Sequence, residues 1–377
     1  MIGPKAIIHL DRLIHNYQLV KQKTGNKQIM AFVKANAYGH GAVSVAKALE
    51  SVGADWFGVF TPGEAIELRK GGVSGNIMVF CRFQSEFLEK AKEWDLILNI
   101  SCENDLNEII TFHGEMNSSP RFHVKIDTGM TRLGLPIDSV SSFFNLLKKN
   151  SHLNYEGIYS HFATADEGDL NYANFQLEQF NGVLDTAEKM DLSFQHIHFS
   201  NSGSVLNLPE SYFTMVRVGL LLYGAFPSNE VPQDLPIQPV MEFKAPVVNL
   251  REVKKGTLVS YGGVWSASQD TIIGVVQAGF ADGFPRAWFE KGSISFKGER
   301  YKIAGRVCMD QLTVDFFNAN VQCGDEVLLF GKNKIDSIPV EEIAERIDST
   351  AYVLLTSIGG RTERIFSGIE LNHSDSA

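Results

Sequence analysis

Short apolar runs alternate with amphipathic segments along the chain as far as about residue 225. Each run is too short for a buried helix, and the segment after it places apolar residues at three- and four-residue spacing. Such a pair predicts a strand followed by a helix. The expected strands cover residues 30–33, 56–60, 77–81, 96–100, 121–126, 155–160, 197–199 and 214–218. This alternation predicts an α/β fold of the TIM type, a (β/α)8 barrel, with an open doubly wound sheet as the alternative.

Capping residues define where several of the helices begin and end. The segment 61–64, Thr-Pro-Gly-Glu, is a capping box with proline at the first helical position, and Gly71 is expected to end that helix. Asp11 and Asp138 are each expected to cap a further helix. The remaining helices are expected over residues 42–49, 86–93, 105–112 and 170–189.

Beyond the last of these strands the pattern changes. Residues 227–240 contain four prolines among polar residues, which predicts a linker. The following strands are expected over residues 241–250, 271–277, 294–297, 301–303, 312–315 and 326–330, with one helix near 340–347. We therefore predict a barrel over residues 10–230 and a mostly β domain over residues 231–377, joined by an N-terminal strand from residues 1–9.

Composition narrows the class of protein. The chain has 377 residues, of which 44% are hydrophobic and 21% charged, as in ordinary globular enzymes. Its net charge of -10 argues against binding to nucleic acid, and no apolar stretch is long enough to span a membrane. The N-terminus lacks the apolar region of a signal peptide. Four scattered cysteines form no CxxC pair, so we expect a cytoplasmic protein with neither a disulfide framework nor a metal site.

Polar side chains follow several of the predicted strands. Lys34 comes after an apolar strand, where burial would lower its pKa and leave a nucleophilic amine suited to imine chemistry. The alternative is a strand-end lysine with its ammonium in water. Arg132, His161 and Arg217 also follow strands, and the carboxyl ends of barrel strands meet at one rim. These side chains are therefore expected to converge on one site.

A second feature of that rim is the segment 201–204, Asn-Ser-Gly-Ser, which begins a helix after the seventh strand. Its hydroxyls and free N–H groups suit a phosphate, and the alternative is a simple helix cap. An imine-forming lysine beside a phosphate site suggests pyridoxal 5'-phosphate as the cofactor.

Eight sequence blocks in order resemble the alanine racemases, which are fold-type III pyridoxal-phosphate enzymes. The blocks are VKANAYGHG at 33–41, KIDTGMTRLG at 125–134, IYSHFATAD at 158–166, FSNSG at 199–203, MVRVGLLLYG at 215–224, VSYG at 259–262, GFADGFPR at 279–286 and GRVCMDQ at 305–311. The resemblance covers nearly the whole chain. It implies an isomerase that interconverts L-alanine and D-alanine, supplies D-alanine for peptidoglycan, and forms a homodimer with shared active sites.

The resemblance also implies roles for individual residues. Lys34 carries the cofactor as an imine and is one of two bases, and the other is Tyr261, contributed by the partner subunit. Two bases on opposite faces of the substrate carbon can exchange its proton without moving around it. Arg217 contacts the pyridine nitrogen, and His161 links Arg217 to Tyr261. The other implied cofactor contacts are Tyr38, Asn201, Ser202, Gly219 and Tyr352.

Three further residues have implied roles. Arg132 is implied to bind the substrate carboxylate or to orient the 3'-hydroxyl of the cofactor. The backbone N–H of Met309, from the partner subunit, is implied to bind the substrate carboxylate. Lys125 matches a lysine that many family members carry as a carbamate, which would hold the Arg132 guanidinium in place. The alternative for Lys125 is an ion pair with Asp127.

The sequence departs from the family pattern at three positions. Thr131 replaces a usual glycine, Phe280 replaces a common tyrosine near the substrate entrance, and Val353 follows Tyr352 where an acidic residue is usual. A racemase of serine or of several small amino acids therefore remains an alternative. So do a fold-type III decarboxylase, which should lack the Tyr261 block, and a non-catalytic pyridoxal-phosphate carrier, which should lack the β domain.

Overall fold

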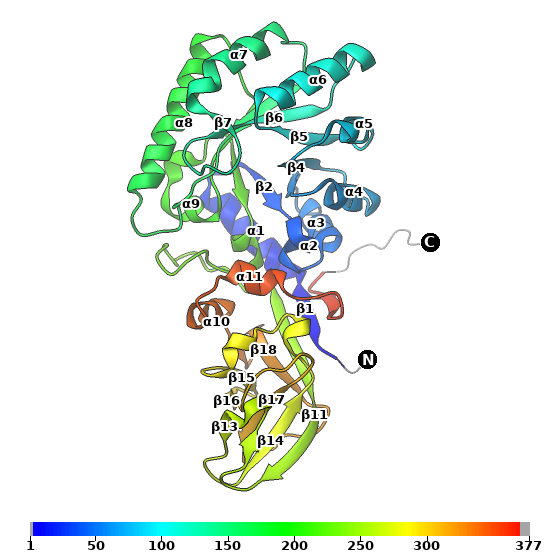
Figure 1. Ribbon diagram of the computed structural model, residues 1–377, viewed down its shortest axis with the longest axis vertical. Coiled ribbons are helices and arrows are strands. Elements are labelled where there is room, and N and C mark those ends of the chain that lie inside the picture. The colour runs from blue at the N-terminus through cyan, green and yellow to red at the C-terminus, as the bar shows by residue number, and fades with distance from the viewer. Residues whose placement is uncertain (1–2, 370–377) are drawn as a thin grey trace.

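Parallel strands close into a barrel in the upper half of the molecule (Figure 1). The computed structural model describes residues 3–369. The barrel strands are β2 (Gln28–Phe32), β3 (Trp56–Val59), β4 (Asn76–Arg82), β5 (Leu96–Ile100), β6 (Arg121–Asp127), β8 (Tyr155–Tyr159), β9 (His196–His198) and β10 (Met215–Val218). Because β5 pairs with β6 and β10 pairs with β2, the ring has no free edge. The predicted barrel is confirmed, and the open sheet is wrong.

Helices surround this barrel. They are α1 (Leu10–Lys23), α3 (Ala42–Glu50), α4 (Pro62–Lys70), α5 (Leu88–Glu93), α6 (Glu103–Met116), α7 (Val140–Lys149), α8 (Asn171–Lys189) and the short α9 (Ser202–Asn207). The capping box predicted before α4 is present. The Glu64 N–H donates to the Thr61 hydroxyl, and the Thr61 N–H donates to the Glu64 carboxylate. Gly71 ends this helix as expected.

The two predicted aspartate caps are wrong. Helix α1 begins at Leu10, directly after strand β1 (Lys5–His9), so Asp11 lies inside the first turn. A carboxylate there still interacts favourably with the helix dipole. Asp138 lies in a 3-10 turn, η2 (Ile137–Ser139), which leads straight into α7 and leaves no separate capping position.

A second sheet forms the lower half of the molecule (Figure 1). Its antiparallel strands β11 (Met241–Val253), β14 (Thr271–Val276), β17 (Leu312–Phe317), β16 (Glu299–Ile303), β15 (Ser293–Phe296) and β18 (Glu326–Lys332) form a small closed ring, because β18 also pairs with β11. The first described strand, β1, pairs with β11 and with the parallel strand β20 (Glu363–Ser367). The N-terminal segment is therefore part of this sheet.

The remaining elements of the lower half are short. The helix expected near residue 340 is α10 (Val340–Arg346). A second helix, α11 (Ala351–Thr356), was not predicted because six residues are too few to display helical periodicity. Further pairs of residues form β7 (Leu135–Pro136), β12 (Leu258–Val259), β13 (Trp265–Ser266) and β19 (Ser337–Ile338). Residues 1–2 and 370–377 of the predicted second domain lie outside the described residues.

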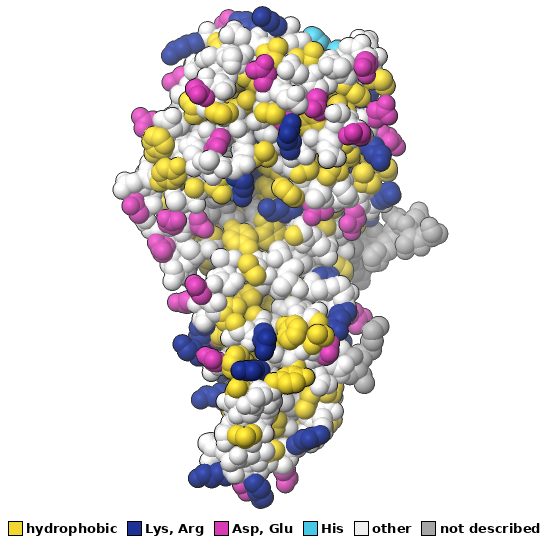
Figure 2. Space-filling model, in the orientation of Figure 1, with side chains coloured by type: hydrophobic (Ala, Val, Ile, Leu, Met, Phe, Trp, Pro, Cys, Tyr) yellow, Lys and Arg dark blue, Asp and Glu magenta, His cyan; other side chains and the backbone are white. Residues whose placement is uncertain are grey.

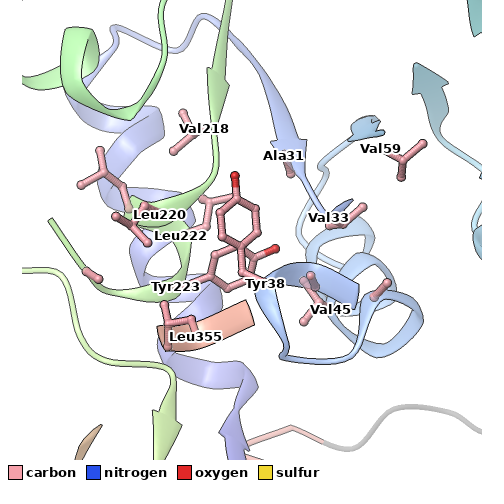
Figure 3. Packing of buried hydrophobic residues seen from close by; sticks show 14 of the residues in the cluster. Ala31, Val33, Tyr38, Val45, Val59, Val218, Leu220, Leu222, Tyr223 and Leu355 are labelled. Atoms are coloured by element: carbon pink, nitrogen blue, oxygen red, sulfur yellow. The ribbon is translucent and has the colours of Figure 1, made fainter. Parts of the chain in front are cut away.

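Aromatic packing joins α11 to the barrel (Figure 3). The rings of Tyr38 and Tyr223 lie side by side, 4.9 Å between centroids, and Leu355 of α11 lies next to them. Tyr352, also on α11, places its ring 5.9 Å from that of Tyr38. A residue of the β half is thereby held at the rim of the barrel. Among residues 3–369, no helix combines the length and the apolar character needed to cross a membrane.

Candidate active site

The backbone directly after β2 takes a left-handed path. Ala35, Asn36 and Ala37 have φ between +51° and +54° and ψ between +47° and +51°, and Tyr38 has φ of +52°. These residues form α2 (Lys34–Tyr38), a left-handed turn. For residues other than glycine this conformation costs about 1–2 kcal/mol each. Such strain persists only where the surroundings impose it, and it is typical of functional sites.

Lys34 begins this turn. Its amine makes no hydrogen bond or salt bridge within residues 3–369 and lies 5.5 Å from the centroid of the Phe32 ring. Burial and the neighbouring guanidinium of Arg132 lower the pKa of Lys34, while the Glu64 carboxylate opposes the change. A lowered pKa increases the fraction of nucleophilic amine. This supports the hypothesis of a reactive lysine over a fully solvated ammonium.

Other cations lie close to Lys34. Burial and the charges of Arg132 and Arg217 lower the pKa of Lys125 to about 8. The alternative ion pair of Lys125 with Asp127 does not form, because the Asp127 carboxylate instead accepts the N–H groups of two residues in the following turn. Within the described chain, Arg132 also has no hydrogen-bonded partner. A group of cations with so few anions favours an anionic ligand. Figure 2 shows Lys and Arg side chains near the junction of the two halves.

Arg217 is the most completely bonded member of this group. One Nη atom donates to Nδ1 of His198 at 3.0 Å and to its carbonyl at 2.8 Å. The other donates to Nδ1 of His161 at 3.2 Å and to the carbonyl oxygens of Ser160 and Phe199. The expected contact between Arg217 and His161 is therefore present. Burial lowers the pKa of Arg217 to about 10, which leaves the guanidinium charged at neutral pH.

The protonation of His161 follows from this contact. A guanidinium has only donors, so Nδ1 of His161 accepts and its proton is on Nε2. Burial, then the charge of Arg217, lower the pKa of His161 well below its ordinary value. His161 is therefore neutral and presents an N–H on the side away from Arg217.

A cradle of small groups lies beside this cluster. A Cβ atom at Gly219 would lie 2.5 Å from the Tyr38 hydroxyl oxygen, so only glycine permits this approach. The Gly219 N–H donates to the Ser202 hydroxyl at 3.3 Å. Burial raises the pKa of Tyr38 and of Tyr352, which keeps both phenols protonated as donors. Two phenols, a hydroxyl and a backbone N–H form a donor set that fits a phosphate group.

The Asn201 side chain caps helix α9 beside this cradle. Its side-chain oxygen accepts the Ser204 N–H at 3.0 Å, and the Ser204 hydroxyl accepts the Asn201 N–H, which is a complete capping box for α9. The helix cap, which the sequence offered as the alternative to a phosphate site, is therefore present. It orients the Ser202 hydroxyl toward Gly219, since Ser202 is the first residue of the helix.

Tyr261 and Met309 do not join this group in the single chain. Both lie in the β half, where Tyr261 is 69% exposed and Met309 55% exposed. Within residues 3–369, neither side chain forms a hydrogen bond or salt bridge to the barrel. The segments that carry them are in contact. The hydroxyl of Ser260, which precedes Tyr261, donates to the Arg306 carbonyl and lies 4.0 Å from the sulfur of Cys308, which precedes Met309.

Sequence reasoning missed His198 and Glu64 as parts of this site. His198 had a signal, because it alternates with His196 along a strand whose inward side faces the barrel core. Glu64 was recognised only as a helix-capping residue, and its contact with Ala35 joins segments that are distant in sequence.

Two models of known protein domains match most of this chain. The family model for the alanine racemase N-terminal domain matches residues 8–227, and that for the alanine racemase C-terminal domain matches residues 240–366. The chain belongs to the alanine racemase family. Members of this family are pyridoxal-phosphate-dependent, dimeric isomerases. An alanine racemase from Desulforamulus reducens is 36% identical over 367 residues, covering 96% of this chain and 98% of the relative.

Solved structures of the alanine racemase family are similar throughout. The alanine racemase from Streptomyces lavendulae superposes with a TM-score of 0.92 at 33% identity, covering 99% of both chains. The one from Clostridium difficile superposes with a TM-score of 0.91 at 32% identity, covering 97% of this chain and 96% of the other. The alanine racemase fold therefore extends over both halves of this chain.

Proposed function

We propose that this protein is a pyridoxal-phosphate-dependent racemase that interconverts L-alanine and D-alanine. The observation that carries the proposal is that Lys34, Arg217 and the cradle of donor groups at Gly219 meet at one barrel rim, in a chain of the alanine racemase family. When bound, the cofactor draws electrons from the substrate Cα and makes its proton removable.

The described residues suit this cofactor. Lys34 would hold it covalently through Nζ. Tyr38, Ser202, Gly219 and Tyr352 would bind its phosphate, and Asn201 shapes the start of α9 beside it. Arg217 would donate to the pyridine nitrogen. Because a guanidinium does not give up its proton, that nitrogen would stay unprotonated, which limits electron withdrawal and favours rapid return of the proton to Cα.

Two bases would remove the Cα proton from one face and return a proton to the other. The Lys34 amine would serve one face of Cα, and Tyr261 of the partner subunit would serve the other. A phenol ordinarily titrates near pH 10. The charge of Arg217, with the Nε2–H of the neutral His161 between them, would stabilise the phenolate. The exposed position of Tyr261 supports its reaching a neighbouring chain in a homodimer.

The substrate carboxylate would bind to Arg132 and to the backbone N–H of Met309 of the partner subunit. Arg132 has no protein partner among residues 3–369, which leaves its guanidinium available for a carboxylate. The Met309 N–H likewise donates to no protein acceptor in the described chain. A carboxylate held on both sides would fix the orientation of Cα between the two bases.

We also propose that Lys125 carries a carbamate. With a pKa of about 8, roughly a tenth of Lys125 is neutral, reactive amine at pH 7. The nitrogen lone pair would attack the carbon of CO2, form an N–C bond and release one proton to solvent. The product anion would accept hydrogen bonds from Arg132 and offset the crowded cations. A carbamate carbon signal after incubation with labelled bicarbonate, absent in Lys125→Met, tests this.

We propose further that the chain divides near residue 230 into a barrel and a β domain, with β1 belonging to the latter. The gap between the two family models, from residue 227 to residue 240, supports this division. We propose a cytoplasmic enzyme that supplies D-alanine for peptidoglycan. The four unpaired cysteines fit a reducing compartment.

A broader substrate range is the second candidate. Phe280 is 42% exposed, and its N–H donates to the Cys308 carbonyl beside Met309. An apolar ring at this position, in place of a tyrosine, removes one polar contact from the entrance and favours acceptance of slightly larger amino acids such as serine. Initial rates of racemisation for alanine, serine and other small amino acids would rank them.

The main experiment uses purified holoenzyme with L-alanine in heavy water. Loss of optical rotation with deuterium at Cα is the expected result. Release of carbon dioxide would indicate a decarboxylase, and an unchanged substrate would indicate a non-catalytic carrier. Lys34→Ala should lose the yellow colour of the bound cofactor, whereas Lys334→Ala, an exposed lysine of the β half, should keep it. A coloured Lys34→Ala protein would contradict the cofactor assignment.

A further inference from the structure

The carboxylate of Glu64 connects the ends of two barrel strands. Its Oε2 atom accepts the N–H groups of Phe60 at 2.8 Å and Thr61 at 3.0 Å, at the end of β3. A capping box needs only the second of these bonds. The other oxygen, Oε1, accepts the N–H of Ala35 at 2.7 Å. One carboxylate therefore joins the start of α4 to the turn that carries Lys34.

Ala35 is the first residue of this turn with left-handed φ and ψ, and its N–H lies directly after Lys34. Left-handed backbone is unfavourable for alanine, so this turn needs contacts that hold it. Glu64 supplies a charge-assisted bond at the start of the turn. At the end of the turn the His40 ring, whose pKa burial lowers to about 4, supplies neutral hydrogen bonds, in which Nδ1 donates to the carbonyl oxygens of Ala37 and Tyr38.

The left-handed turn decides where two cofactor contacts lie. Lys34 stands at its beginning, and Tyr38, at its end, places its hydroxyl against Gly219. A group that holds the turn thus sets the distance between the covalent attachment point and the phosphate cradle. The Glu64 carboxylate is also the anion that opposes the lowering of the Lys34 pKa.

We propose that Glu64 is a positioning residue for the racemase reaction. By holding the Ala35 N–H, it keeps the left-handed turn in place and so aligns Lys34 and Tyr38 with the cofactor. This inference rests on the proposed function, because it assigns both residues to cofactor binding. Glu64 does not itself touch the reacting atoms, and it acts through the backbone.

The structure offers a matched control. Thr61→Ala removes the hydroxyl that caps α4 but leaves all three bonds to the Glu64 carboxylate. Glu64→Ala keeps the Thr61 hydroxyl as a cap but removes all three bonds to the carboxylate, including the one to Ala35. Glu64→Gln keeps the size of the side chain but has a single oxygen, which can serve only one of the two strand ends.

Hydrogen exchange of the segment 33–41 in the holoenzyme is the first measurement, and loss of bound cofactor on dilution is the second. We expect Glu64→Ala and Glu64→Gln to exchange this segment faster and to hold the cofactor about tenfold less tightly. Thr61→Ala should match the wild type in both measurements, even if its melting temperature falls.

Equal behaviour of Glu64→Ala and Thr61→Ala would overturn the proposal, as would wild-type exchange and cofactor retention in both Glu64 variants. If Glu64→Ala fails to fold, the isosteric Glu64→Gln decides. Neither measurement needs racemisation. An enzyme that binds the cofactor but leaves alanine unchanged would therefore refute the proposed function without touching this test.

Discussion

Nη1 of Arg217 lies 3.0 Å from Nδ1 of His198, and the hydrogen bond between them can run in only one direction. Arginine has no acceptor, so His198 accepts at Nδ1 and carries its proton on Nε2. That Nε2 lies 2.8 Å from Nδ1 of His123, which must accept in turn. Burial lowers the pKa of both histidines, so both are neutral. A chain of hydrogen bonds, all donated in the same direction, therefore runs from Arg217 at the barrel rim through His198 to His123 in the core.

This chain predicts that His198 holds Arg217 in place. His198→Phe removes the acceptor and leaves one guanidinium donor without its buried partner, which typically costs about 1–3 kcal/mol. We expect weaker cofactor retention and an activity lower by about tenfold. His196→Gln is the control, since His196 lies on the same strand but bonds to Gln28 instead. Cofactor retention and turnover should both be lower in His198→Phe than in His196→Gln. Equal values in the two variants would contradict the role of His198.

Shared active sites predict that two inactive variants restore each other. Lys34→Ala and Tyr261→Phe should each have little activity alone. In a mixed dimer, one site would lose both groups while the other would regain both. Random exchange of subunits should therefore restore about a quarter of wild-type activity. The measurement is the racemisation rate before and after the two proteins exchange subunits. No recovery, despite mixed dimers detected by native mass spectrometry, would place both bases in one chain.

Thr131 lies in left-handed backbone, with φ of +53°. This conformation disfavours a β-branched side chain by about 1–2 kcal/mol, and glycine accepts it without strain. The Thr131 N–H bonds to Asp127 and survives the change to glycine. We expect Thr131→Gly to raise the melting temperature by roughly 1 °C, corresponding to about 1 kcal/mol. Thr111→Gly, in the interior of α6, should lower it instead. A melting temperature below wild type for Thr131→Gly would show that the threonine is not strained.

Lys125 predicts a pH-dependent stability of the cofactor-free protein. Burial and Arg132 lower its pKa to about 8, whereas the unfolded chain titrates near pH 10.4. Between these values the unfolded chain holds a proton that the folded protein has released, so this residue's contribution to stability rises with pH. Below pH 8 the buried charge opposes folding. In bicarbonate-free buffer, Lys125→Met should therefore melt higher than wild type at pH 7.

The difference between Lys125→Met and wild type should shrink as the pH approaches 10. Thermal unfolding at the two pH values measures it, and Lys334→Met, at an exposed lysine, is the control. Added bicarbonate should raise the melting temperature of the wild type alone if Lys125 takes up CO2. A constant difference at both pH values would mean that Lys125 titrates like a solvated amine.

Local patterns in the sequence determined the barrel, its capping box at residues 61–64 and the strand ends at which Lys34 and Arg217 lie. Hydrophobic periodicity and helix caps depend on neighbours a few residues away, so they can be interpreted without coordinates. The predictions that Asp11 and Asp138 cap helices were wrong because helix starts also depend on contacts with distant segments. The boundary between β1 and α1 lies at His9 and not at Asp11, because β1 pairs with strands that are distant in sequence.

Only the tertiary structure decided how the strand ends are held. The left-handed turn after Lys34 is unfavourable by itself and exists because Glu64 and other distant groups bond to it. The contact of Arg217 with His198 likewise requires the pairing of β9 with β10. The sequence by itself therefore determined which reactive groups are present. The fold decided their protonation and alignment, because burial and distant hydrogen-bond partners set both.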